Sequence, residues 1–506
     1  MSVARVGAFW LGLALCTEGL ALELSPDDFR ITEAGPALDE GYVAVNPGIT
    51  YNATANEFLL VWSGDSPVDA PVLEDEIYAQ RIDGTTGRNI GSPVRVSRMG
   101  PDVPNLSAGK RARDDQAKGL GFFEALNPEV AWNSQNNTYL VVWWGDDNTG
   151  TLVDDKREVF GRRLAADASP LDEQFRISFM GLEGDTEAEG KTPAVAYSAS
   201  QNEFFVAWSG DNIVDVTMDQ ETEIWGQRIA GDSNLLLERV IRISDMGAVD
   251  GNPSFTAADC AIAVDEVNGN YFVTWEGDDD SATGVNGDVE VYGQLIDMAT
   301  GDEVGPNDIR ISALGPPGDT RFDSTNASPA YNPLANEYLV AWNGSDDNGG
   351  SVRNDMEIWV KRIGADGSLL EASRRITSMG PDGSDTYWAL NPILRVDPVD
   401  GTYLLVFRGE DDAGMLVNNE FEVYGHRLNP DGTRDRERER LSQMGPDGNS
   451  QYGAGRGDMA YNSQTRQFLT VWDGNDDRED LAFREIEVFG QFLLPGLLFS
   501  DSFELQ

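Results

Sequence analysis

The sequence has almost no cysteine or histidine. Its 506 residues include two cysteines and one histidine. Cys16 lies in an N-terminal apolar segment, so we expect Cys260 to be the only thiol of the mature chain, which leaves no intramolecular disulfide. We expect Cys260 to be a small buried hydrophobe on a strand. His426 occupies a repeat position that elsewhere holds Gln, Arg or Lys, and we expect it to face outward without acting as a general base.

Other catalytic patterns are also missing. The chain has no Gly-x-Ser-x-Gly elbow, no cysteine–histidine pair, no phosphate-binding loop and no sialidase-type Asp box. A hydrolase or lyase that uses only carboxylates is compatible with this inventory, because two acids suffice for glycoside chemistry.

Long apolar runs are confined to the N-terminus. Residues 1–21 combine Arg5, an apolar run and small residues near position 21, which predicts a cleaved signal peptide and an exported protein. A lipoprotein anchored at Cys16 is the alternative, although Leu15 is bulkier than the residue usual before a lipidated cysteine. No later stretch is long enough to cross a bilayer.

Basic residues are scarce. Lys and Arg total 37 against 87 Asp and Glu, giving a formal charge of −50. Such a charge argues against nucleic acid or an anionic membrane surface as partner and favours a cationic ligand. The most basic segment, 110–118, lies in an insertion at 101–126, which predicts either a flexible loop or a docking loop.

What the sequence has in abundance is repetition. An apolar strand recurs seven times at intervals of 65 to 67 residues, except for a first interval of 81 that contains the insertion. The aromatic residues that mark the ends of these strands are Trp62, Trp143, Trp208, Trp275, Trp342, Phe407 and Trp472. Recurring aromatic and methionine residues of this kind are expected to pack between sheets.

Each repeat contains four strand-like pieces, such as 193–198, the run ending at Trp208, 223–229 and 242–247. The last repeat lacks its fourth piece, and a matching piece stands at 29–36, ahead of the first repeat. An open solenoid would need polar caps at its ends, whereas this arrangement lets the chain close on itself.

We therefore predict an all-β fold, a seven-bladed β-propeller of four-stranded antiparallel blades, with the last blade closed by the N-terminal strand. The propeller is expected to span 22–494, with a C-terminal tail at 495–506. The strand sharing resembles the closure of propeller families generally, and the repeat resembles those of secreted bacterial repeat proteins. That resemblance implies no particular reaction.

Acidic residues recur at both ends of the connection between the second and third strands. Pairs such as Glu420 and Glu422 stand two apart on a strand, so their side chains should point the same way and repel each other unless a cation relieves them. Ca²⁺ accepts such oxygen ligands. The candidate ligands are Asp146, Asp147, Glu158, Asp278, Asp279, Asp288, Glu290, Asp346, Asp347, Asp355, Glu357, Asp411, Asp412, Glu420, Glu422, Asp476, Asp477, Glu485 and Glu487. The alternative is that these acids only solvate the loops.

Two functions follow from these patterns. The favoured one is an exported, noncatalytic and monomeric scaffold whose acidic face holds Ca²⁺ and presents loops to a glycan or protein. The alternative is a secreted carbohydrate-active hydrolase or lyase that uses carboxylates on the same face. Arg456-Gly457-Asp458 spells the tripeptide read by integrins, and we interpret it as a chance occurrence in a chain rich in Gly and Asp.

Overall fold

The fold was analysed in a computed structural model of the chain. It describes residues 28–35, 42–64, 75–100, 123–147, 152–153, 155–182, 184–211, 221–247, 252, 254–279, 287–316, 318–346, 355–381, 386–411, 416–477, 481 and 485–493. The expected signal peptide, the C-terminal tail, and nearly all of the insertion lie outside these residues.

The described residues form 28 strands and no helix. The innermost strands are β2 (Ala44–Asn52), β6 (Ala125–Asn133), β10 (Gly190–Ser198), β14 (Thr256–Asp265), β18 (Ser324–Asn332), β22 (Ala389–Val396) and β26 (Gly453–Asn462). The second strands are β3 (Glu57–Gly64), β7 (Thr138–Asp146), β11 (Glu203–Asp211), β15 (Asn270–Asp278), β19 (Glu337–Gly344), β23 (Tyr403–Gly409) and β27 (Gln467–Asn475). Since none of the described elements is helical, this part of the chain contains no helix that could cross a membrane.

Two further strands complete each repeat on its outer side. The third strands are β4 (Glu76–Asp83), β8 (Arg157–Leu164), β12 (Thr222–Ala230), β16 (Val289–Asp297), β20 (Glu357–Gly364), β24 (Glu422–Leu428) and β28 (Glu487–Leu493). The outermost strands are β5 (Asn89–Arg95), β9 (Phe175–Arg176), β13 (Leu236–Arg242), β17 (Glu303–Arg310), β21 (Arg374–Arg375), β25 (Glu439–Arg440) and, at the N-terminus, β1 (Phe29–Arg30).

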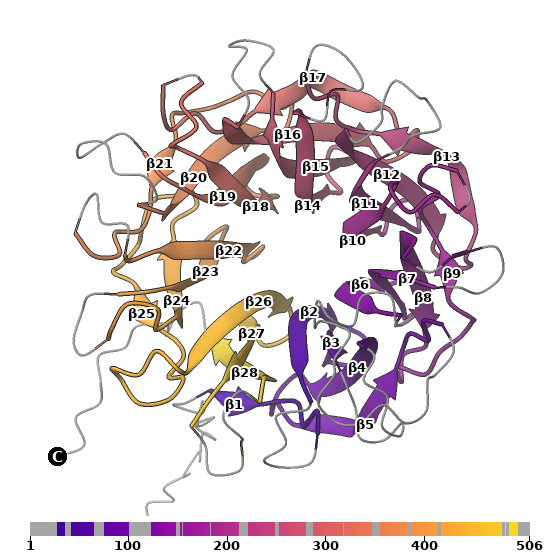
Figure 1. The fold of residues 1–506 in the computed structure, drawn as a ribbon, viewed down its shortest axis with the longest axis horizontal. Coiled ribbons are helices and arrows are strands. Elements are labelled where there is room, and N and C mark those ends of the chain that lie inside the picture. Colours follow the sequence, from indigo (N-terminus) through magenta and orange to yellow (C-terminus); the bar gives the residue numbers. More distant parts are fainter. Residues whose placement is uncertain are drawn as a thin grey trace, which may run out of the picture.

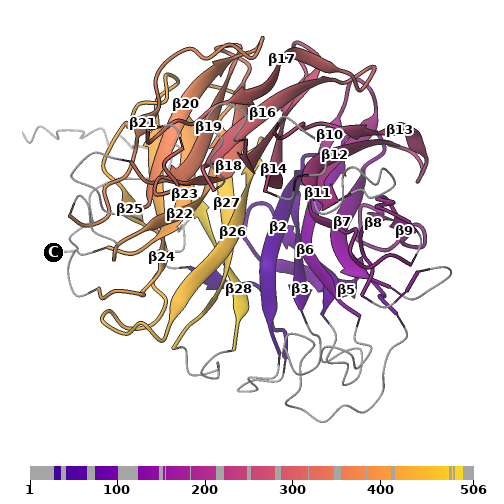
Figure 2. The same cartoon turned by 45° about the horizontal axis from the view of Figure 1, so that its top comes forward.

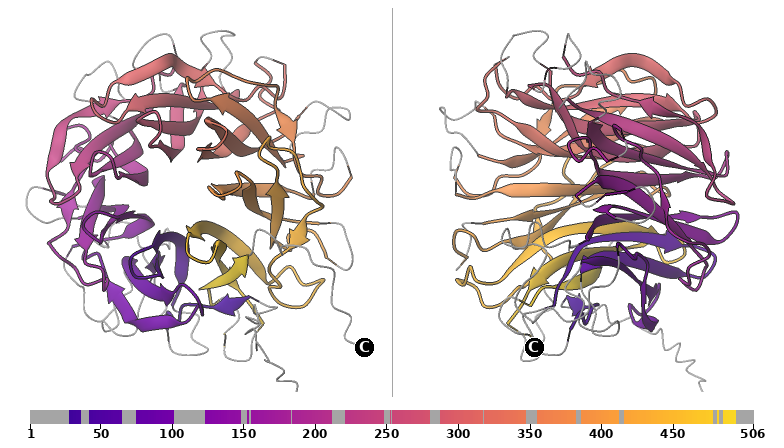
Figure 3. Two further views of the ribbon diagram at one scale, coloured as in Figure 1. Left: turned by 180° about the vertical axis from the view of Figure 1, so that it is seen from behind. Right: turned by 45° about the vertical axis from the view of Figure 1, so that its right-hand side comes forward.

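These strands form a β-propeller. Five sheets have four strands each, and one has eight, in which β12 and β14 are joined by a single parallel pair, Thr222 with Thr256. Figure 1 shows the sheets arranged around a central axis with the innermost strands facing it. Each innermost strand contacts the next one along the chain, and β26 contacts β2. Figure 2 shows the same arrangement tilted so that its top comes forward, and Figure 3 shows it from behind and turned about the vertical axis.

The N-terminal strand completes the sheet of the last repeat, as the sequence predicted. β1 pairs antiparallel with β28, with Phe29 opposite Gly490. Beyond the strand, the Thr32 hydroxyl donates to Glu487 at 2.5 Å and the Ala34 amide donates to the same carboxylate at 2.9 Å. The first and last strands of the chain thereby protect each other's edges.

The expected aromatic packing is present in the core. Trp62 stacks on Tyr78 at 5.9 Å between ring centroids, and Trp143 stacks on Phe160 at 6.4 Å. The indole of Trp143 also donates to the sulfur of Met99 in the preceding repeat at 3.4 Å. Similar aromatic pairs, Trp275 with Tyr292 and Phe407 with Tyr424, and a second indole–methionine contact between sheets, Trp208 with Met180, occur elsewhere around the axis.

The outermost strands lie earlier in the chain than the sequence suggested. We expected a strand over 242–247, but β13 ends at Arg242, and β9 likewise ends at Arg176. Beyond it, the Ser178 hydroxyl and the Met180 amide donate to the carboxylate of Glu158. A side chain thus replaces the backbone ladder as the hydrogen-bond partner of this segment.

Replacing Glu487 tests the ring closure. Glu487→Ala leaves the Thr32 hydroxyl and the Ala34 amide without their acceptor, and we expect it to lower the free energy of unfolding by roughly 1–3 kcal/mol in urea titrations. Glu33→Ala is the control because that side chain is 83% exposed. Equal effects of the two changes would contradict a closing role for Glu487.

Candidate active site

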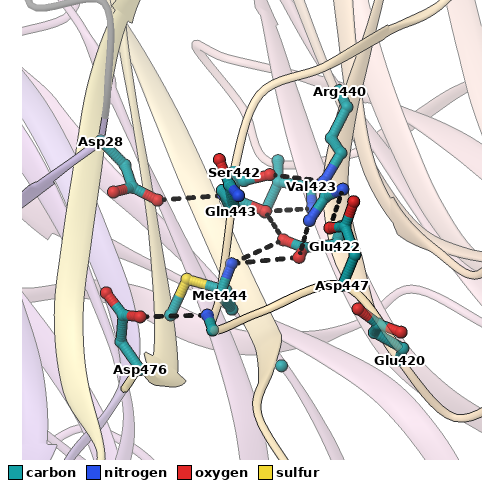
Figure 4. Close-up of polar contacts among 12 residues, drawn as sticks. Asp28, Glu420, Glu422, Val423, Arg440, Ser442, Gln443, Met444, Asp447 and Asp476 are labelled. Carbon is teal, nitrogen blue, oxygen red and sulfur yellow. Dashed lines mark hydrogen bonds and ion pairs between the residues drawn. The ribbon is translucent and has the colours of Figure 1, made fainter. Parts of the chain in front are cut away.

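The glutamates at the starts of the third strands are structural. Glu422 accepts hydrogen bonds from the Arg440 guanidinium, the Ser442 hydroxyl and the Met444 amide, the last at 3.0 Å (Figure 4). We call this arrangement the glutamate clamp. Corresponding clamps are built on Glu76, Glu158, Glu223, Glu290 and Glu357, and on Glu487 with Thr32 and Ala34.

The second carboxylate of each predicted pair has other partners. Glu420 accepts from the Gly448 amide at 3.0 Å, and Asp288 accepts from the Gly318 amide at 2.9 Å. Asp355 and Glu485 lie in the same position of their repeats and are buried. The two acids of a pair therefore satisfy donors on different segments.

The aspartates that open these loops mostly bind nearby backbone amides or arginines. Asp146 accepts from the Glu124 amide at 3.0 Å, Asp476 from the Gly445 amide at 3.0 Å, and Asp411 pairs with Arg438. Asp147 and Asp278 likewise accept from the amides of glycines. Asp279, Asp346 and Asp477 lie at the same loop starts, whereas Asp347 and Asp412 lie outside the described residues.

The second repeat differs at one clamp. Lys156 stands where the other repeats have an acid, and it is fully buried. Its ammonium donates to the carbonyls of Met180 and Ala188 and lies 3.5 Å from Glu158. Ala188 occupies the position of an aromatic residue such as Phe255, which packs on Gly247. We infer that the lysine stem fills the volume of that missing ring.

Within the described residues, no group of three or more carboxylate, imidazole or thiol side chains is placed to hold a metal ion. Ca²⁺ binding at these loops stays a prediction. In the clamps, hydrogen-bond donors of the protein compensate the buried negative charge of each glutamate.

A clamp variant separates the two explanations. Glu422→Ala leaves three donors without an acceptor, and we expect a loss of roughly 3–5 kcal/mol, the cost of breaking a buried ion pair, reduced because Arg440 is 24% exposed. The loss should be the same in Ca²⁺ and in chelator, with the exposed Glu437→Gln as control. A loss seen only with Ca²⁺ would support a metal ligand.

A different set of polar residues surrounds the axis. Every innermost strand carries a β-bulge near its start, for example between Val45 and Gly48 in β2. Six bulge residues have φ between 46° and 56°: Asn46, Asn127, Thr192, Asp259, Asn326 and Asn391. Such angles are tolerated by Asn and Asp, but they are unusual for the β-branched Thr192. In β26 the corresponding residue is Arg456, which is exposed.

The bulges link neighbouring repeats. The backbone amide of Asn46 donates to the carboxylate of Asp473 at 3.0 Å, and the backbone amide of Asn326 donates to the carboxylate of Glu276 at 3.1 Å. Burial and the negative charge of Asp259 raise the pKa of Glu276 to about 7. A bulge re-aims the backbone at the cost of local strain, and here it carries polar side chains to the axis.

The position two residues after each bulge breaks the symmetry of the ring. It holds Gly48, Glu129, Ala194, Ala261, Ser328, Ile393 and Asp458. Only the second and seventh repeats carry an acid there. These two repeats flank the first, whose Gly48 has no side chain, because β2 contacts both β6 and β26.

The two acids have different surroundings. Asp458 accepts from Arg395 at 2.6 Å and from the Ile49 amide at 3.0 Å, which stabilises its negative charge. Burial, followed by the charge of Asp458, raises the pKa of Glu129 to about 8, and Arg395 opposes this shift. Burial therefore favours the protonated form of Glu129, whereas Asp458 is bound by a guanidinium and a backbone amide.

Two cavities meet at Glu129. The first, of about 210 Å³, is lined by the bulges of all seven innermost strands, including Asp259 and Arg456. The second, of about 580 Å³, runs along the same strands and is lined by Glu129, Asp458 and Arg395. Its lining also includes the small residues Ala194, Ala196, Ala261, Ala263, Ser328 and Ala330, beside larger ones such as Tyr197 and Ile262.

Two sequence expectations concern residues near this site. Cys260 lies on β14 and packs against a core cluster, as expected, but it is only partly buried and also lines both cavities. The expectation that His426 faces outward is wrong, since it is 1% exposed and stacks on Phe407 at 6.1 Å between centroids. Burial lowers the pKa of His426 to about 4, so the imidazole is neutral at neutral pH.

The sequence analysis did not identify Glu129, Asp458 or Arg395, because recurring acids were taken as the signal and these residues do not recur in most repeats. The available signal was the difference between each of these residues and the residues at the same position of the other repeats. Asp458 was noticed only as part of an Arg-Gly-Asp tripeptide, whose arginine and aspartate both line the cavities.

No family model and no curated protein matches this chain. Among solved structures, an ulvan lyase of a new polysaccharide lyase family aligns with a TM-score of 0.51 and 11% identity, covering 90% of this chain and 96% of that one. An α-L-arabinanase of Penicillium chrysogenum has a TM-score of 0.42 and 12% identity, covering 76% and 94%. An α-L-arabinofuranosidase of Fusarium graminearum has a TM-score of 0.45 and 9% identity, covering 94% and 99%.

The likeness to the ulvan lyase supports the β-propeller fold. One expectation needs correction: the sequence favoured a noncatalytic scaffold, but the similar structures named above are carbohydrate-active enzymes. The preference for a scaffold rested on acids that repeat around the ring, as active sites do not. Glu129 and Asp458 remove that objection, because most repeats have no acid at their position.

Proposed function

We propose that the protein is a secreted carbohydrate-active enzyme that cleaves a glycosidic bond with Glu129 and Asp458. The proposal rests on the surroundings of these two acids in the cavities at the axis. Arg395 lies 2.6 Å from Asp458, and burial favours the protonated form of Glu129. With Glu129 as the acid and Asp458 as the base or nucleophile, this pair has the two carboxyl groups that glycoside chemistry uses.

The reaction follows from the roles of the two carboxyl groups. Glu129 donates its proton to the oxygen of the departing sugar as the bond between that oxygen and the anomeric carbon breaks. Asp458 either takes a proton from the water that attacks the anomeric carbon, or bonds to that carbon first and is released by water. The anomeric configuration of the first product distinguishes these routes.

The rest of the cavity lining suits a sugar. Side chains of the bulge residues, including Asn46 and Asn127, place amide groups around the first cavity. Amides can both donate to and accept from sugar hydroxyls. The small residues opposite the acids leave room for a sugar ring.

A lyase is the second candidate, favoured by two guanidinium groups. Arg456 lines the first cavity and Arg395 lines the second. A guanidinium can neutralise the carboxylate of a uronic acid while a base removes the adjacent proton and the glycosidic bond is eliminated. A lyase product is unsaturated, so a rise in ultraviolet absorbance separates elimination from hydrolysis.

Three accompanying predictions stay open. Export through the signal peptide at 1–21 would bring the enzyme to extracellular glycans. Ca²⁺ bound in the loops between the second and third strands would stabilise the propeller without contacting Glu129 or Asp458. We also infer that the propeller has seven blades, because the eight-stranded sheet holds two sequence repeats joined by one residue pair.

Substitution of the two acids tests the proposal. Glu129→Gln and Asp458→Asn should each lower kcat by roughly 10²- to 10⁴-fold on the polysaccharide that the parent cleaves, because each removes a proton-transfer or nucleophilic group. Arabinan, ulvan and a panel of neutral and acidic polysaccharides are the first substrates. Glu173→Gln, at a side chain that is 97% exposed, is the matched control. Full activity in either acid variant would refute the assigned roles.

The pH dependence supplies a second test. Activity should fall as pH rises through about 8, because Glu129 then loses the proton that it donates. The folded chain holds this proton to higher pH than the unfolded chain, so its contribution to stability is present at acid pH and is lost as pH rises through about 8. Glu129→Gln should therefore raise Tm relative to the parent in alkaline buffer, and less so at acid pH. A pH-independent difference would contradict the raised pKa.

A further inference from the structure

We propose that this site acts only at chain ends, as an exo-acting enzyme, and that the terminal sugar is bound inside the ring. The inference rests on the proposed function and adds the class of substrate, a glycan with an accessible end. It follows from where Glu129 and Asp458 lie along the innermost strands.

The acids lie below the rim of the channel. Glu129 and Asp458 each follow a bulge residue by two positions along a strand. Asp458 lines only the second cavity, whereas Glu129 lines both. A glycosidic bond must therefore pass the bulges, or enter from the opposite end, before it can reach both carboxylates.

The opening at the bulges is surrounded by protein. All seven innermost strands line the first cavity of about 210 Å³. The side-chain amide of Asn391 donates to the side chain of Asn326 at 2.6 Å, so these neighbouring bulge residues are in contact across the gap between two sheets. From this side, a glycan can reach the acids only through the opening that the bulges surround.

The wall around the acids is continuous. Each innermost strand contacts the next, and β26 contacts β2. At the second acid, the Ile49 amide of β2 donates to Asp458 of β26, and on the other side Arg395 of β22 binds the same carboxylate. An enzyme that cuts within a chain needs a groove open at both sides, whereas a closed ring admits only an end.

The inner cavity has room for the terminal unit. Its volume is about 580 Å³, within the range of roughly 300–1,000 Å³ typical of ligand sites. Ala194, Ala261 and Ser328 leave space opposite the acids. The product released from this pocket should be short and of one size.

The test uses the full mature protein and the polysaccharide that it cleaves, prepared at two chain lengths. At equal mass, the initial rate should rise in proportion to the number of chain ends, a single short sugar should appear from the first turnovers, and viscosity should fall slowly. A rate independent of chain length, with a ladder of oligosaccharides and an early collapse of viscosity, would overturn the inference.

A binding measurement separates this failure from failure of the proposed function. Glu129→Gln, titrated calorimetrically with short oligosaccharides and with the long polymer, should bind in proportion to chain ends. Chain-end binding without cleavage by the parent would retain the site and refute the enzyme, whereas binding in proportion to polymer mass would refute the chain-end inference.

A blocked channel gives a matched comparison. Ala261→Trp should abolish this binding because the indole fills the cavity opposite the acids. Ala199→Trp, on an exposed turn, should leave it unchanged. Thermal unfolding of both variants shows whether the fold is retained, and retained binding in a folded Ala261→Trp variant would overturn the proposed location.

Discussion

The glutamate clamp is the interaction on which the rest of this propeller depends. A carboxylate at the start of each third strand ties together an arginine at the end of the outermost strand, a hydroxyl and a backbone amide in the segment that leads to the next sheet. Buried charges are tolerated only when their partners are complete, and here the partners come from the two segments that must meet. The clamp therefore fixes the segment that connects one repeat to the next. It has the same role at the ring closure, where Glu487 accepts hydrogen bonds from Thr32 and Ala34.

This scaffold accounts for the channel. With the outer connections fixed, the innermost strands meet the axis at equivalent positions, and their bulges place polar side chains around one opening. The innermost strands place seven equivalent positions around the axis. A single active site requires that some of these positions differ, and the second, sixth and seventh repeats supply Glu129, Arg395 and Asp458 near one another along the axis. The first repeat contributes Gly48, whose lack of a side chain lets β2 pack closely on β6, since a Cβ there would lie 2.8 Å from the Pro128 carbonyl oxygen.

The distribution of charge has a similar logic. The protein is strongly acidic overall, yet most of the recurrent loop acids that we followed bind arginines, hydroxyls or amides. Burial raises the pKa of clamp glutamates such as Glu422, and it also raises the pKa of Glu129 and Glu276 near the axis. Glu129 differs from the clamp glutamates because its counterparts in the other repeats are mostly uncharged and because it lines both cavities.

The sequence by itself determined the β-propeller architecture, the four-stranded repeat and the pairing of its first strand with its last sheet, because these follow from periodic patterns and from counting strands. It also exposed the clamp glutamates, although as candidate metal ligands. Only the tertiary structure decided what those acids touch, since Arg440 and Ser442 are eighteen and twenty residues away from Glu422 in the chain. It alone also decided that Glu129, Arg395 and Asp458 meet, because they come from repeats far apart in sequence that closure of the ring brings side by side. Periodicity identifies what repeats, and a site made of exceptions becomes visible when the repeats are placed around a common axis.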